Sequence, residues 1–187
     1  MSDAFAYLSV LLSIIIGLAI AEILQGYRRL LLARGKVRLY APPLIWSVMM
    51  LMMAAQFWWV SFGLRYVENW DFAAFCAVLL QTIMLFMGTT LLIPRGDADE
   101  ALDLKAHYYR ESVPFFSFGL LFIVIGLIKD WLLEAFDRPA WSFWFFGFFA
   151  GLTLISLLTR QSRVHEIVAP IMAVTIVLFF ALTFWRL

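Results

Sequence analysis

Charged residues are scarce in this chain of 187 residues: 14 lysines and arginines and 13 aspartates and glutamates make up 14% of it. Soluble domains typically carry about 25% charged and about 45–50% apolar residues. Here 64% of the residues are hydrophobic and the mean hydropathy is +0.91. The core of a protein of this size cannot hide so much apolar surface from water. The composition therefore excludes a soluble domain and indicates a protein whose solvent is lipid.

Cysteine and histidine are nearly absent as well. The single cysteine, Cys76, excludes an internal disulfide and a C-x-x-C redox pair. The two histidines, His107 and His165, lie outside the centres of the apolar segments, which excludes a buried haem held by paired histidines. The phosphate-binding motif G-x-x-x-x-G-K-[ST] and the nucleophile motif G-x-S-x-G do not occur. We identify no cofactor, no metal ligand set and no catalytic set, and the sequence favours a protein that is not an enzyme.

The 27 charges leave six charge-free windows, at residues 4–21, 39–64, 72–94, 112–128, 139–159 and 167–185. A helix needs about 20 apolar residues to cross a hydrocarbon core of about 30 Å, and each window is close to that length. Barrel strands would alternate apolar with polar residues, which these windows do not. We therefore expect an all-α integral membrane protein, a single domain with a bundle of six transmembrane helices. The expected spans are about 4–24, 43–64, 72–93, 113–131, 140–159 and 167–185.

The lysines and arginines predict the orientation of this bundle, because cytoplasmic loops retain positive charge. The first, third and fifth loops together hold ten of them, and the other side holds four. Both termini are thus expected outside the cytoplasm, in a bacterial inner membrane. The first window reads as a retained span, since no basic segment precedes it.

An amphipathic cytoplasmic helix is expected in the third loop, at about residues 98–111. Asp97 and Glu100, three residues apart after a Pro-Arg-Gly turn, form a variant of the capping box that opens helices. In the same reading, Pro114 lies in the first turn of the fourth span, where a proline is tolerated.

Polar residues within or beside the spans are the candidates for an ion or solute path, because ionisable groups in lipid are costly. The candidates are Glu22, Gln25, Gln56, Gln81 and Thr175. Glu22 and Gln25 share one helical face near the cytoplasmic end of the first span, and an interfacial ion pair is the alternative role for Glu22. The two deeper amides, Gln56 and Gln81, are expected at similar depth, where such groups either line a path or join helices by hydrogen bonds.

The first span carries small residues at strict four-residue spacing: Ser9, Ser13, Gly17 and Ala21. A stripe of this kind lets two helices approach closely in lipid. We expect this helix at the centre of the bundle or at a subunit interface.

A basic segment follows the first span and holds Arg28, Arg29, Arg34, Lys36 and Arg38. These side chains are expected to contact anionic lipid headgroups, and their role in setting the orientation is the simpler alternative. Bound lipid is accordingly expected. Nucleic acid is not an expected partner, because no soluble domain or aromatic platform accompanies the charge.

Two classes of function remain open. The first is a small channel or transporter subunit for an ion or small solute, in a homo-oligomer. The second is a non-catalytic accessory subunit of a larger membrane complex, or a protein that binds a lipid or a hydrophobic cofactor. A lipid-modifying enzyme is a third possibility, for which Glu22, His107 and His165 are the only available groups.

Overall fold

The computed structural model describes residues 3–67, 70–95, 101–133 and 140–184. In these ranges the chain forms six α-helices, a short 3₁₀ helix and one pair of two-residue strands. The elements are α1 (Asp3–Leu32), β1 (Val37–Arg38), α2 (Ala41–Ser61), η1 (Phe62–Tyr66), α3 (Phe72–Thr90), β2 (Leu102–Asp103), α4 (Leu104–Leu132), α5 (Ala140–Leu158) and α6 (Ser162–Phe184).

Five of these helices are long and apolar enough to cross a membrane: α1, α2, α3, α4 and α6. The helix α5 is apolar as well, over the shorter range Phe143–Leu158. Helices satisfy their backbone hydrogen bonds internally, which the hydrocarbon interior requires. Large apolar side chains cover the outside of the bundle, among them Leu18 and Val174, 53% and 60% exposed. The expectation of an all-helical integral membrane protein is confirmed.

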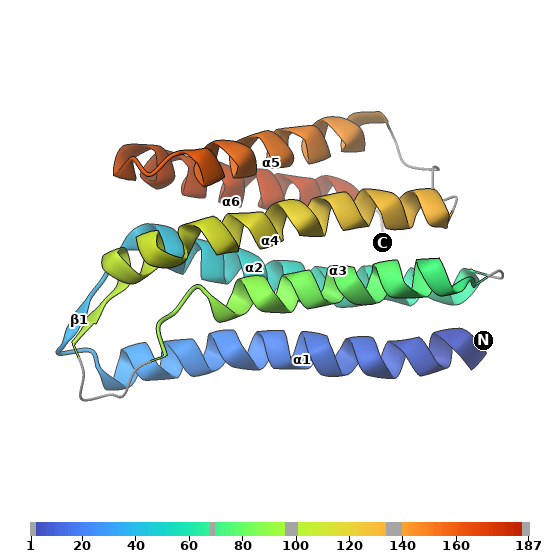
Figure 1. Ribbon diagram of the computed structural model, residues 1–187, viewed down its shortest axis with the longest axis horizontal. Coiled ribbons are helices and arrows are strands. Elements are labelled where there is room, and N and C mark those ends of the chain that lie inside the picture. The colour runs from blue at the N-terminus through green and yellow to red at the C-terminus, as the bar shows by residue number, and fades with distance from the viewer. Residues whose placement is uncertain (1–2, 68–69, 96–100, 134–139, 185–187) are drawn as a thin grey trace.

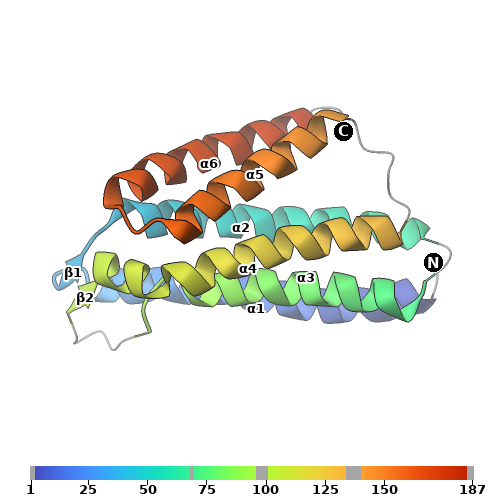
Figure 2. The same cartoon turned by 45° about the horizontal axis from the view of Figure 1, so that its top comes forward.

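The helices form two groups (Figures 1 and 2). In the first, α3 packs between α1 and α4, and α2 lies against α1. In the second, α5 and α6 form a hairpin, with α5 on α4 and α6 on α2. Figure 2 shows that this hairpin is close to α4 at its α5–α6 turn and diverges from it toward the other end.

Connections α1–α2, α3–α4 and α5–α6 meet at one end of the bundle, which we call the basic end (Figure 1). α1 begins and α6 finishes at the opposite end, which we call the terminal end. At the basic end, β1 pairs in parallel with β2, with Val37 opposite Leu102 and Arg38 opposite Asp103. The two connections that the sequence assigns to the first and third loops are thereby joined directly.

Two expected boundaries differ in the structure. α1 continues to Leu32 instead of ending near residue 24, so its last two turns carry basic residues out of the apolar segment. The separate amphipathic helix at about 98–111 is not formed: Leu102–Asp103 is a strand, and Asp103 accepts a hydrogen bond from the backbone N–H of Ala106 to open a single helix. Asp97 and Glu100 lie outside the described residues.

Pro114 consequently lies inside α4 and not in its first turn. Prolines are tolerated within membrane helices because neighbouring groups satisfy the freed backbone carbonyl. The amphipathic segment and the apolar segment are thus one helix of 29 residues, in which the change from polar to apolar composition does not coincide with a break.

Candidate functional site

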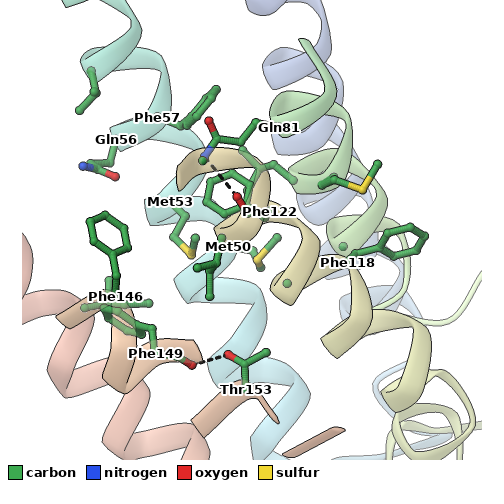
Figure 3. Close-up of a pocket in the computed structure, with 18 of the residues that line it drawn as sticks. Met50, Met53, Gln56, Phe57, Gln81, Phe118, Phe122, Phe146, Phe149 and Thr153 are labelled. Atoms are coloured by element: carbon green, nitrogen blue, oxygen red, sulfur yellow. Dashed lines mark hydrogen bonds between the residues drawn. The ribbon is translucent and has the colours of Figure 1, made fainter. Parts of the chain in front are cut away.

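A cavity of about 370 Å³ lies between the two groups of helices. Side chains from α2, α3, α4, α5 and α6 line it, and most of them are aromatic or methionine. Figure 3 shows Met50, Met53, Phe57, Phe118, Phe122, Phe146 and Phe149 around it. Its volume lies in the range of about 300–1,000 Å³ that is typical of small-molecule sites.

The cavity follows from the divergence of the α5–α6 hairpin. It runs from Trp46 and Phe116, toward the basic end, to Ser61 and Leu64, near the terminal end. Gly119 contributes to its wall without a side chain: a Cβ there would lie 3.5 Å from Cγ2 of Thr153. Bare backbone on α4 therefore lets α4 and α5 lie close together at this point, and a larger side chain at position 119 would occupy the space between them.

Aromatic rings close the cavity toward the basic end. Trp46 meets Phe115 and Phe116 edge-to-face, with ring centroids 5.4 Å apart in both pairs. Phe116 in turn packs on the buried imidazole of His165, at 5.6 Å. Edge-to-face geometry is the arrangement that aromatic quadrupoles favour.

His165 joins α6 to α4 at this closed end. The imidazole is 1% exposed, its Nδ1 lies 2.9 Å from the Tyr108 hydroxyl, and its Nε2 lies 2.7 Å from the Thr159 carbonyl. A carbonyl only accepts, so Nε2 carries the proton and donates to Thr159. In the neutral ring, Nδ1 then accepts the hydrogen bond from Tyr108. The start of α6 is thereby fixed to α4.

A second hydrogen-bonded group surrounds this contact on its outer side. The Tyr40 hydroxyl lies 3.0 Å from the Tyr109 hydroxyl and donates to Oε1 of Glu166 at 3.2 Å. Burial, with further contributions from Tyr109 and Glu166, raises the pKa of the Tyr40 phenol above its ordinary value. Tyr40 therefore remains a protonated donor. Sequence reasoning had no signal for this group, because its members come from three distant segments.

Gln81 of α3 is a buried polar group in the wall of the cavity. Its Nε2 donates to the backbone carbonyl of Phe122 on α4, at 3.3 Å. This contact requires the glycine at position 126, because a Cβ there would overlap the Gln81 amide nitrogen. Gln56 of α2 lines the same cavity from another side (Figure 3). Thr153 is also polar, but its hydroxyl donates to a carbonyl of its own helix, at 2.7 Å.

A charged pair lies at the rim of the cavity toward the terminal end. Nζ of Lys129 is 3.4 Å from a carboxylate oxygen of Asp130, and the two side chains are 12% and 14% exposed. The ammonium also lies over the ring of Phe57, 5.9 Å from its centroid, within the range of cation–π attraction.

The five predicted path residues do not all come together. Gln56 and Gln81 share the cavity, whereas Glu22 pairs at the basic end with Arg95 at 3.1 Å and Arg29 at 3.6 Å. Gln25 is exposed beside that pair. Thr175 donates to a carbonyl of its own helix and is not among the cavity residues. Glu22 thus has the interfacial ion-pair geometry that the sequence left as an alternative.

The small-residue stripe lies beside the buried face of α1: Ser9 and Ala21 are half-buried, and Trp58 of α2 donates a hydrogen bond to the Ser13 hydroxyl at 3.3 Å. Ser13 and Gly17 are exposed, and no atom would lie within 4 Å of a Cβ at Gly17. The buried face of α1 is instead large and apolar, formed by Phe5, Leu8, Leu12, Ile16 and Ile23. α1 lies at the edge of the bundle (Figure 1), so the expected central position is wrong. The alternative, a subunit interface, stays a prediction.

The basic segment lies at the basic end as its sequence position requires. Arg28, Arg34, Lys36 and Arg38 are exposed, and Arg38 pairs with Asp103 at 3.2 Å. Arg29 is more buried, and its contact with Glu22 turns it toward the protein. The exposed members have the access to headgroups that lipid contact would need.

The three groups that a lipid-modifying enzyme would need lie apart, each with its own partners. His107 contacts the Leu91 carbonyl through Nε2, at 3.0 Å, and receives a hydrogen bond from Arg110 on Nδ1, at 3.1 Å. His165 and Glu22 are held by the contacts described above. Among the described residues, no three histidines, cysteines or acidic residues converge as a metal site would require.

Comparisons of the chain with protein-family models, with characterised proteins and with solved structures find no match. The chemistry of the site is therefore argued from its own residues. A largely apolar cavity with one or two amides suits an apolar molecule that carries a small polar group.

Proposed function

We propose that this protein binds a lipid-like molecule, with a long apolar chain and a small polar group, in the cavity between α2, α4 and the α5–α6 hairpin. The observation that carries the proposal is the cavity itself, whose lining is aromatic and methionine-rich. The volume of the cavity suits a single alkyl chain.

Binding is favoured over transport of an ion or small solute for a physical reason. A water-filled path needs polar walls along its length, and of the five polar candidates only Gln56 and Gln81 line the cavity. Lys129 and Asp130 are the charged groups among the described cavity residues, and they lie together at one rim. The accessory-subunit hypothesis is compatible with a bound lipid and needs no separate site.

The topology is also part of the proposal: six spans, with α5 as the fifth, and both termini outside the cytoplasm of a bacterial inner membrane. Its support is the charge at the basic end, which collects ten lysines and arginines: Arg28, Arg29, Arg34, Lys36, Arg38, Arg95, Lys105, Arg110, Arg160 and Arg163. Arg65 and Lys129 lie toward the terminal end. Positive charge is retained on the cytoplasmic side.

Native mass spectrometry of the protein, extracted from its own membranes in mild detergent, tests the binding function. We expect a lipid-like molecule bound at a fixed ratio. Gly119→Leu places a side chain at the cavity wall and should displace it. Gly147→Leu is the matched control, because position 147 on α5 is exposed and does not line the cavity. Equal occupancy in both variants would contradict the proposal.

Cysteine labelling tests the topology. In a Cys76→Ala background, a cysteine replaces Gly35 at the basic end or Gly63 at the terminal end, two positions where a Cβ meets no atom within 4 Å. An impermeant maleimide applied to spheroplasts should label position 63 and spare position 35. The reverse pattern would overturn the orientation.

A further inference from the structure

A hydrogen-bond acceptor without a partner is buried in the wall of the cavity. Gln81 is 5% exposed, and its Oε1 has no hydrogen-bond partner among the described residues. The orientation of the amide follows from its neighbour: the Phe122 carbonyl only accepts, so the amide nitrogen faces Phe122 and the oxygen points away from it. Figure 3 shows the Gln81 oxygen on the side of Phe57.

The position of this acceptor is fixed on both sides. On one side the amide lies against bare backbone of α4 at Gly126, which leaves no space behind it. On the other side the rings of Phe57 and Phe122 pack edge-to-face, 5.7 Å apart. Gln81 is therefore not a flexible surface amide that finds water by changing rotamer. An acceptor held unsatisfied in this way is destabilising, and a donor brought by a ligand would remove that cost.

Lipid surroundings increase the importance of this acceptor. Hydrocarbon tails are as apolar as the cavity wall, so an apolar chain gains little by leaving the bilayer for the cavity. Tails also carry no donors. A ligand that brings a hydroxyl gains a hydrogen bond in the cavity that the hydrocarbon interior does not supply.

We infer that the ligand is an uncharged amphiphile with one long apolar chain and a hydroxyl group that donates a hydrogen bond to Oε1 of Gln81. This inference rests on the proposed function and specifies its ligand class. A formal charge on the ligand is disfavoured, because Lys129 and Asp130 at the rim pair with one another. A carbonyl of a quinone or an ester only accepts, and would leave the Gln81 oxygen unsatisfied.

Two probes of nearly equal shape, 1-dodecanol and its methyl ether, separate the contribution of the hydroxyl donor from that of the alkyl chain. Each is added to the full-length protein in phospholipid nanodiscs, and occupancy is measured by native mass spectrometry. We expect the wild type to bind the alcohol roughly three- to tenfold better than the ether, as a single neutral hydrogen bond predicts. Gln81→Leu should reduce this ratio to about one while ether binding is retained. Gln25→Leu, at an exposed position of α1 that does not line the cavity, is the matched control and should leave the ratio unchanged.

The outcomes distinguish this inference from the function on which it rests. If both probes bind the wild type equally and Gly119→Leu displaces both, the cavity binds lipid-like molecules and the role of Gln81 is overturned. The same conclusion holds if Gln81→Leu preserves the preference for the alcohol. If neither probe binds, or Gly119→Leu displaces neither, the proposed function itself fails. Should Gln81→Leu not fold, the wild-type ratio decides: a ratio near one overturns the inference, and a preference for the alcohol supports it.

Discussion

The Tyr108 hydroxyl lies 2.9 Å from Nδ1 of His165, and both side chains are almost fully buried. The two residues are 57 positions apart, in α4 and α6. This contact anchors the α5–α6 hairpin at the basic end, and the cavity opens where the hairpin diverges toward the terminal end (Figure 2). The hydrogen-bonded pair thus helps to fix the hairpin at the closed end of the site.

Tyr108→Phe tests that anchor. The substitution removes the donor and leaves Nδ1 of the buried His165 unsatisfied, at a cost of about 1–3 kcal/mol. We expect a lower midpoint of thermal unfolding in detergent. Tyr7→Phe, at a position 78% exposed, is the control and should change nothing. An unchanged midpoint for Tyr108→Phe would show that the contact does not hold the hairpin.

Gly126→Ala tests the close approach of α3 and α4. The new methyl group would displace the Gln81 amide and break its hydrogen bond to Phe122, so we expect a loss of about 0.5–1.5 kcal/mol, measured by thermal unfolding. Gly17→Ala, where the space is open, should instead stabilise α1 by up to about 1 kcal/mol.

Gly126 and Gln81 together allow a second test of the contact between α3 and α4. Combining Gly126→Ala with Gln81→Ala removes the overlapping amide, so the double variant should lose less than the sum of the two single losses. Strictly additive losses would contradict the described contact.

Asp103 gives the protein an acid-sensitive contact at the start of α4. The backbone N–H of Ala106, and after it Arg38, hold the pKa of the Asp103 carboxyl below its usual value of 3.8. A lowered pKa in the folded state means that the carboxylate stabilises the fold above pH 3.8, and that this stabilisation is lost as the pH falls through the lowered pKa.

Asp103→Ala should therefore be less stable than the wild type at pH 6, and the difference should shrink in acid. Asp103→Asn retains the capping oxygen and should lose only the pairing with Arg38. Thermal unfolding from pH 7 to pH 3 measures both. A wild-type advantage over Asp103→Ala that grows as the pH falls would contradict the assignment.

Substitutions of Glu22 and Arg95 test whether Glu22 forms an ion pair instead of lining a transport path. In a double-mutant cycle, Glu22→Gln and Arg95→Gln should show a coupling of about 0.2–1 kcal/mol that decreases with salt, because the Arg95 side chain is 64% exposed. Gln25→Leu, one turn further along α1, should leave stability unchanged. Absence of coupling at low salt would return Glu22 to the candidates for a path.

Part of the candidate site could be predicted from the sequence. Gln56 and Gln81 stand out as polar groups in apolar segments, and the structure places both in one cavity. Their partners could not be found in the same way. Gly126 and the Phe122 carbonyl are unremarkable in the sequence, and their importance follows only from the contact of α3 with α4.

The small-residue stripe shows where pattern reasoning fails. Ser13 and Gly17 predict close packing of α1, but the helix buries its large apolar face and leaves these two residues exposed. Spacing identifies which residues share a face. It does not identify which face meets the protein, because in lipid an apolar helix can expose any side without contact with water.

The sequence by itself determined the solvent, the helical class and the positions of the long apolar segments, because charge in hydrocarbon is costly enough to segregate 27 charged residues into the connections and helix ends. Only the tertiary structure decided which faces of those helices meet. Helices that are apolar all round carry no stripe to fix their rotation, so the pairing of Gln81 with Phe122, 41 residues away, and of Tyr108 with His165 depends on packing and on a few buried hydrogen bonds. The cavity and the unsatisfied Gln81 oxygen in its wall exist because of that packing.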